Sequence, residues 1–189
     1  MNENVINIFN RINYEDNLLN NRRTIKVVGF YKRLKERFLI FAHNNDAQFT
    51  YFTWYYGMHR CSFDYRTSFY TTLREYYIDG IPEGTTATTL AQFLQNQGRF
   101  EFVFATKMLN LLDESRFPIV DRIIAQTFGF NGSYIEDGET LIQDIQETYD
   151  FILVHDEHGI VQRFINDFQC EGIGYYRIFD FIFFSLGNI

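Results

Sequence analysis

The chain has 189 residues, of which 46% are hydrophobic and 19% aromatic, and this composition suits one folded domain with a substantial core. No apolar run approaches the roughly 20 residues of a membrane span, and the first residues lack the pattern of a secretory signal, so we expect a cytoplasmic protein without a membrane partner. The net charge of −7 argues against a non-specific nucleic-acid binder.

The N-terminal half shows helical spacing of apolar residues. Residues 4–20 predict one helix. Residues 24–42 begin with the β-branched TIKVV, which also fits a strand, but their second half predicts a helix. A helix is expected over 46–58 with Asp46 as its N-cap, and another over 65–78.

The C-terminal half continues the same pattern. Thr85 or Thr86 caps a helix that Gly98 ends, and residues 100–112 form a strongly apolar helix. Pro118 is expected in the first turn of a helix over Ile119–Phe128, followed by the loop NGSYIEDG. The last three predicted helices are 139–153, 159–169 and Tyr175–Leu186. We therefore predict one all-α domain over 1–189 with about eight to ten helices, divisible into a subregion 1–45 and a core of about 46–189.

Charge is unevenly distributed along this domain. Residues 1–107 contain 13 Lys and Arg against 10 Asp and Glu, whereas residues 108–189 contain 4 against 14. The densest basic stretch consists of Arg22, Arg23, Lys26, Lys32, Arg33, Lys35 and Arg37. Because affinity for DNA follows local phosphate contacts, this stretch is a candidate phosphate-binding face. A solvated helix face would have the same pattern.

The segment from Ala105 to Asp121 contains the residues with the clearest chemistry. Lys107 lies in an apolar helix, where burial lowers the pKa of an amine and makes it a nucleophile near neutral pH. Asp121 comes three residues after Pro118, in the first turn of the next predicted helix, where the helix dipole favours a carboxylate. A surface lysine and a capping aspartate are the simpler alternative.

This pattern of Thr-Lys, an apolar helix and Pro-apolar-apolar-Asp resembles the helix-hairpin-helix DNA glycosylase superfamily, in particular its 8-oxoguanine glycosylase branch. The tail from Tyr176 to Phe183 is similar to the closing helix of compact bacterial relatives. The resemblance covers roughly residues 90–187. It implies that Lys107 attacks the sugar C1′ and that Asp121 stabilises the developing positive charge and assists proton transfer.

The sequence departs from that family in two places. Family members have Gly-apolar-Gly before the lysine, and those glycines let backbone N–H groups approach a DNA phosphate; this chain has Phe102-Val103-Phe104-Ala105. The interval from Lys107 to Asp121 is also shorter. The alternative to a glycosylase is thus a non-catalytic helical module that binds DNA or protein, in a phage-defence or counter-defence setting.

Further candidates complete the expected site. Trp54, Tyr55 and Tyr56 could wall a base pocket by stacking, although an aromatic helix is more often core. His155 and His158 have a spacing that metals can use, but they lie in a charged stretch, and we expect no metal or other cofactor. Cys61 and Cys170 are expected to be free thiols. The expected substrate is double-stranded DNA with a damaged or modified base, excised with or without abasic-site lyase activity.

Overall fold

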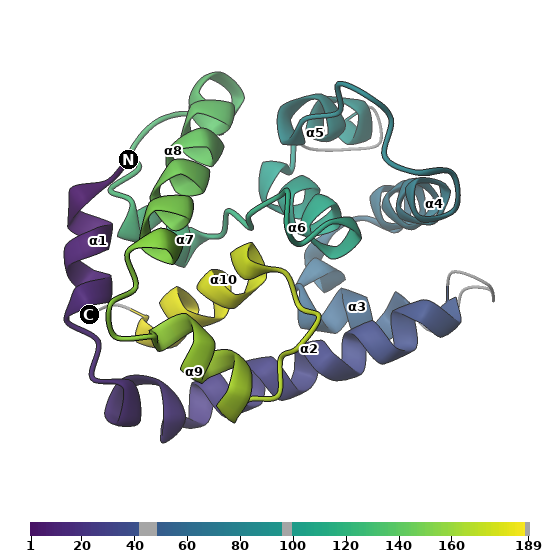
Figure 1. Ribbon diagram of the computed structural model, residues 1–189. Helices are drawn as coiled ribbons and strands as arrows, with labels where there is room; N and C mark the ends of the chain where they lie inside the picture. The colour runs from purple at the N-terminus through teal and green to yellow at the C-terminus, as the bar shows by residue number, and fades with distance from the viewer. Residues whose placement is uncertain (42–48, 96–99, 188–189) are drawn as a thin grey trace.

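Helices make up every regular element of the residues that the computed structural model describes, which are 1–41, 49–95 and 100–187. This confirms the predicted all-α class (Figure 1). The elements are α1 (Glu3–Asn10), a π-helical turn (Glu15–Leu19), α2 (Arg22–Phe41), α3 (Phe49–Tyr55), a 3-10 turn (Met58–Arg60), α4 (Phe63–Asp79), α5 (Ala87–Gln95), α6 (Phe102–Leu112), α7 (Arg122–Thr127), α8 (Tyr134–Val154), α9 (Ile160–Asp167) and α10 (Tyr175–Leu186). None of the described helices is long and apolar enough to cross a membrane.

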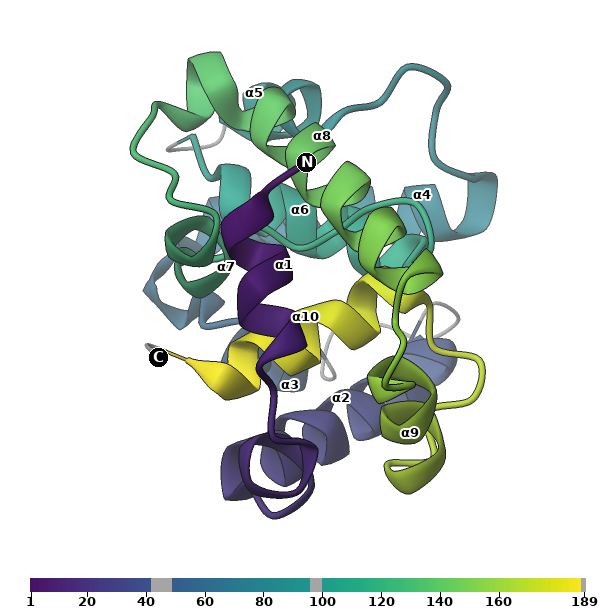
Figure 2. The same ribbon diagram turned by 60° about the vertical axis from the view of Figure 1, so that its left-hand side comes forward.

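Helix α10 lies at the centre of the molecule, between α2 on one side and α7 and α8 on the other (Figures 1 and 2). Every side chain from Arg177 to Phe183 is buried, because this helix is apolar almost all round. Burial of each large apolar side chain contributes roughly 1.5–3 kcal/mol. The tail of the sequence therefore forms the main core, with the boundaries predicted for this helix.

A second group of helices builds the other side of the core. Helices α4, α5 and α6 pack against one another, and α5 and α6 also contact α8. Ala105, Met108 and Leu109 of α6 are fully buried, as the apolar pattern predicts. This packing fixes the helix that contains Lys107 between the two groups.

The predicted N-terminal helix over 4–20 is wrong in its middle. Helix α1 ends at Asn10, and the chain resumes helical geometry only at Glu15. Asparagine side chains bond the backbone here: the Asn13 N–H donates to Asn17 Oδ1 at 2.9 Å, and Asn13 Oδ1 accepts from the Asp16 N–H at 3.4 Å. Such local bonds compete with those of a continuous helix.

The strand alternative for the TIKVV segment is also wrong, because this segment belongs to α2. Val28, Tyr31, Leu34 and Phe38 are buried, and their helical spacing places them on one face. Tertiary packing of that face outweighs the strand preference of β-branched residues. Asp46, the predicted N-cap of the next helix, lies outside the described residues, as does Gly98.

Two boundaries in the C-terminal half differ from prediction. Helix α7 begins at Arg122 rather than Ile119, so Pro118 precedes the helix instead of opening it, and the cap at Asp121 sets the start. Helix α8 begins at Tyr134, inside the predicted loop. The ring of Tyr134 stacks on Phe102 and Phe130, with centroids 5.2 and 5.1 Å apart, and this packing stabilises the additional turn.

Candidate active site

Lys107 is a half-buried cation in the middle of α6. Its Nζ donates to the backbone carbonyl of Tyr56 at 3.4 Å and lies 5.4 Å from the Tyr56 ring centroid and 5.2 Å from that of Phe104. Burial lowers the pKa of the ammonium, while Asp121 and then Asp180 oppose this effect through their charges. The amine therefore loses its proton more readily than a surface lysine does, as a nucleophile requires.

Two polar side chains of α6 hold the segment before α7 against this helix. Thr106 Oγ1 accepts a hydrogen bond from the Val120 N–H at 3.1 Å, and Asn110 Nδ2 donates to the Phe117 carbonyl at 2.7 Å. Thr106 and Asn110 are both fully buried. The predicted lysine and aspartate are the next residues after Thr106 and Val120, so these bonds set their relative position.

Asp121 is the N-cap of α7, as the simpler reading of the sequence expects. Its Oδ1 accepts from the N–H groups of Ile123 and Ile124 at 2.8 and 2.9 Å. These are free N–H groups in the first turn of the helix, where a carboxylate is a favourable cap. Because the same carboxylate raises the pKa of Lys107 and of Asp180, it can act as a cap and as an electrostatic partner at once.

Asp180 is a second carboxylate that acts on Lys107, and it is buried in α10. The Arg177 guanidinium donates to it and also donates to the Tyr55 hydroxyl at 2.7 Å. Burial raises the pKa of the Asp180 carboxyl to about 6, because the loss of hydration outweighs the charge of Arg177. Asp180 can therefore exchange a proton near neutral pH.

Sequence reasoning missed the supporting roles of Thr106 and Asn110 and the action of Asp180 on the lysine. A signal for each was present. Thr106 and Asn110 are polar residues four positions apart in an otherwise apolar helix, so they share a face. Arg177 and Asp180 interrupt the apolar sequence of α10, and buried charges need partners or a use.

The predicted basic stretch lies on α2 but divides into two groups. At about 100° per residue, five of its members fall within about 100° of arc on one side of the helix. These five are exposed: Arg22, Arg23, Lys26, Arg33 and Arg37. The other two contribute to the fold instead, since Lys32 donates to the Phe168 carbonyl and Lys35 pairs with buried Glu114 at 2.9 Å.

The three aromatic residues proposed for a base pocket point to different environments. Trp54 is exposed, Tyr55 is half-buried beside Arg177, and Tyr56 is buried under Lys107. The rings of Tyr55 and Tyr56 meet edge to face with centroids 4.7 Å apart. Tyr55 and Tyr56 therefore belong to the surroundings of the buried charges, whereas Trp54 belongs to the surface.

The remaining candidates contribute no site of their own. The His155 ring stacks on Phe151 with centroids 4.0 Å apart, and its Nδ1 lies 2.8 Å from the Phe151 carbonyl oxygen. Over the ranges described here, no three His, Cys, Asp or Glu side chains gather as a metal would require. Cys61 and Cys170 are both reduced thiols, as expected.

Comparison with known proteins identifies no family for this arrangement. No protein-family model, no curated protein and no solved structure matches the chain. The functional argument therefore depends on the half-buried lysine and the two carboxylates that act on it.

Proposed function

We propose that the protein is a DNA glycosylase with abasic-site lyase activity and that Lys107 is its nucleophile. The observation that supports this proposal is the environment of Lys107: a half-buried amine, with its pKa lowered by burial, on which the charges of Asp121 and Asp180 act. The resemblance of the segment from Thr106 to Asp121 to the helix-hairpin-helix glycosylases points to the same reaction.

In the proposed reaction the target nucleotide is turned out of the duplex so that its sugar reaches Lys107. The neutral amine forms a bond to C1′ while the glycosidic bond breaks, and the base leaves with the bonding electrons and takes up a proton. The amine proton passes to a carboxylate, for which Asp180, with its pKa near 6, is suited. Opening of the sugar ring then yields a Schiff base between Nζ and C1′.

Asp121 would act on the transition state of this reaction. The sugar becomes positively charged as the base departs, and a fixed carboxylate stabilises that charge without having to reorganise. Its two backbone hydrogen bonds hold the carboxylate in place before the substrate arrives. Entry of the sugar requires that Lys107 Nζ give up its contact with the Tyr56 carbonyl.

Borohydride trapping tests the proposal directly, because it reduces a Schiff base to a stable protein–DNA adduct. We expect an adduct with duplex DNA that carries an abasic site or one of a panel of oxidised and deaminated bases. Lys107→Gln should abolish the adduct while leaving the helical circular dichroism unchanged, since glutamine lacks the amine. Arg11→Gln is the control: that arginine is exposed outside α2, and its loss should leave trapping intact.

Asp121→Asn separates the charge of this residue from its role as a cap. Asparagine caps a helix about as well as aspartate, so the fold should be retained. Base removal should slow by about 10²-fold or more, because the lost charge matters mainly in the transition state. Trapping that survives in Lys107→Gln would contradict the assignment of the nucleophile.

One observation favours the alternative of a binding module without catalysis. The first turn of α6, where the family has hairpin glycines, contains Phe102, whose ring packs against Gly138 and Tyr134 in the core. This turn therefore presents apolar packing in place of backbone N–H groups for a phosphate. Salt-sensitive DNA binding without any adduct across the whole substrate panel would support this alternative.

A further inference from the structure

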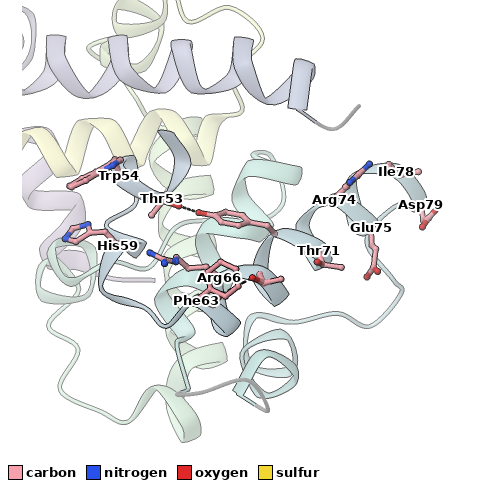
Figure 3. Close-up of a pocket in the computed structure, with 12 residues that line it drawn as sticks. Thr53, Trp54, His59, Phe63, Arg66, Thr71, Arg74, Glu75, Ile78 and Asp79 are labelled. Carbon is pink, nitrogen blue, oxygen red and sulfur yellow. Dashed lines mark hydrogen bonds between the residues drawn. The ribbon is translucent and has the colours of Figure 1, made fainter. Parts of the chain in front are cut away.

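Trp54 is a large aromatic side chain on the surface that the proposed reaction does not use. It is the only tryptophan of the chain and is 66% exposed at the end of α3. Its ring lies against that of His59 (Figure 3). The two rings stack with centroids 4.9 Å apart and 24° between their planes. An exposed indole that a second ring holds in place can stack on another flat, aromatic group.

Two hollows meet at this tryptophan, which lines both. One, of about 790 Å³, runs along α4 and contains Phe63, which is 74% exposed (Figure 3). The other, of about 480 Å³, lies between α2, α3 and α10 and contains Phe30 and Phe184. Both volumes fall in the range of small-molecule sites, roughly 300–1,000 Å³. We call Trp54 together with these two hollows the Trp54 ridge.

Basic side chains lie near Trp54 in both hollows. In the larger hollow, Arg66 lies toward the end that Trp54 and His59 line, whereas Glu75 and Asp79 lie at the opposite end (Figure 3). In the smaller hollow the charged lining residues among those described are Arg23 and Lys26. The Arg23 guanidinium lies 4.1 Å over the Phe184 ring, so its charge is held at the wall of the hollow.

We infer that the Trp54 ridge binds single-stranded DNA, with bases stacked on the indole and phosphates beside Arg23, Lys26 and Arg66. Exposed aromatic faces interleaved with cations are the pattern by which proteins hold unpaired strands, because every base has a face that can stack. A duplex hides those faces and fits the ridge less well. The choice of DNA over RNA rests on the proposed function, while the stacking and the charges do not.

Because Trp54 is the sole tryptophan, fluorescence excited at wavelengths that the 13 tyrosines do not absorb reports on this site alone. We expect saturable quenching when the full-length protein is titrated with an oligodeoxythymidylate of about 16 nucleotides. A duplex of equal length and an oligouridylate should bind more weakly under the same conditions. Absence of quenching, or tighter binding of the RNA strand, would overturn the inference.

Variants measured by anisotropy of a labelled strand test the stacking and the charge. Trp54→Ala should weaken binding by roughly 5- to 150-fold, the range for loss of one stacked base, and Trp54→Phe should retain most of the affinity. Phe93→Ala is the control, because Phe93 is 58% exposed on α5 outside both hollows. Arg66→Gln should weaken binding several-fold, and Arg11→Gln, an equal change of charge at an exposed position outside both hollows, should not.

Three further outcomes keep this inference separate from the proposed function. Lys107→Gln should bind the single strand as the wild type does, even if trapping shows that no glycosylase activity exists. If Trp54→Ala showed normal trapping and unchanged binding of the single strand, the inference would be wrong while the proposed function would stand. Sedimentation at the assay concentration should show the same mass for wild type and Trp54→Ala. If the wild type were a dimer and Trp54→Ala a monomer, the ridge would be identified as a contact between two copies of the chain.

Discussion

At the scale of single residues, the candidate site depends on how much hydration each charge has lost. Asp180 is the clearest example, because burial raises the pKa of its carboxyl from 3.8 to about 6 although Arg177 donates to it. The folded state therefore holds this proton over a pH range in which the unfolded chain has released it. Stability from Asp180 is greatest at low pH and is lost as the pH rises through about 6.

This shift predicts a specific difference between the wild type and Asp180→Asn. The free energy of unfolding of the wild type minus that of the variant should fall as pH rises from 4 to 7, by up to roughly 3 kcal/mol for a shift of about two units. Urea unfolding at each pH measures it. Asp79→Asn, at an exposed carboxylate that ends α4, corrects for the general loss of a negative charge. A difference that grew with pH would show that Arg177 dominates instead.

The same residues show how far the sequence predicts a site. Lys107 and Asp121 could be selected because they belong to one short segment with a recognisable pattern. Tyr56 and Asp180 come from distant parts of the chain, and only the tertiary fold brings them close enough to act on the lysine. No spacing rule reports a contact of that kind.

At the scale of elements, glycines show where two segments approach closely. Gly174 precedes α10 with an ordinary φ of −64°, so backbone strain does not require glycine there. A Cβ at this position would lie 2.6 Å from the Glu114 backbone oxygen, and the Gly174 N–H donates to the Glu114 carboxylate at 3.0 Å. Glu114 also accepts from Tyr31 and Lys35 of α2, so this contact joins α10 to α2.

Two identical substitutions should consequently have opposite effects. Gly174→Ala should lower the free energy of unfolding by roughly 1–3 kcal/mol, because backbone must move to make room. Gly29→Ala, inside α2 with open space around its Cα, should raise it by roughly 0.5–1 kcal/mol. Urea denaturation measures both. An equal effect of the two variants would contradict the close approach of Gly174 and Glu114.

The elements also show why helices were easier to predict than their ends. Apolar periodicity reports the buried face, and it identified α6, α9 and α10 from the sequence alone. The start of α7 depends on which side chain accepts the first free N–H groups, and Asp121 does so instead of Pro118 opening the helix. The start of α8 depends on rings that stack across three segments.

At the scale of the whole molecule, the uneven charge of the sequence becomes a separation in space. Helix α2, which contains the exposed basic residues, and the acidic helix α8 lie on opposite sides of α10 (Figures 1 and 2). Helix α8 contains Glu136, Asp137, Glu139, Asp144, Glu147 and Asp150. A net charge of −7 therefore does not prevent one face from attracting a polyanion, since attraction depends on the local potential.

This separation predicts how binding of duplex DNA depends on salt. The logarithm of the binding constant should fall linearly with the logarithm of salt concentration, with a slope of about −0.9 for each phosphate that the protein neutralises. Joint replacement of Arg22 and Arg33 by glutamine should reduce the magnitude of that slope by about two, because both cations are exposed on the same face of α2. The measurement is an anisotropy titration of a labelled duplex at several salt concentrations.

A second double variant distinguishes a defined face from a general effect of charge. The double variant Arg11→Gln and Arg163→Gln also removes two positive charges, but from exposed positions that line a different hollow of the surface. If the basic face of α2 makes the phosphate contacts, this control should keep the wild-type slope. Equal losses from both double variants would mean that the duplex responds to the charge of the whole molecule, and the assignment of α2 as the phosphate-binding face would be wrong.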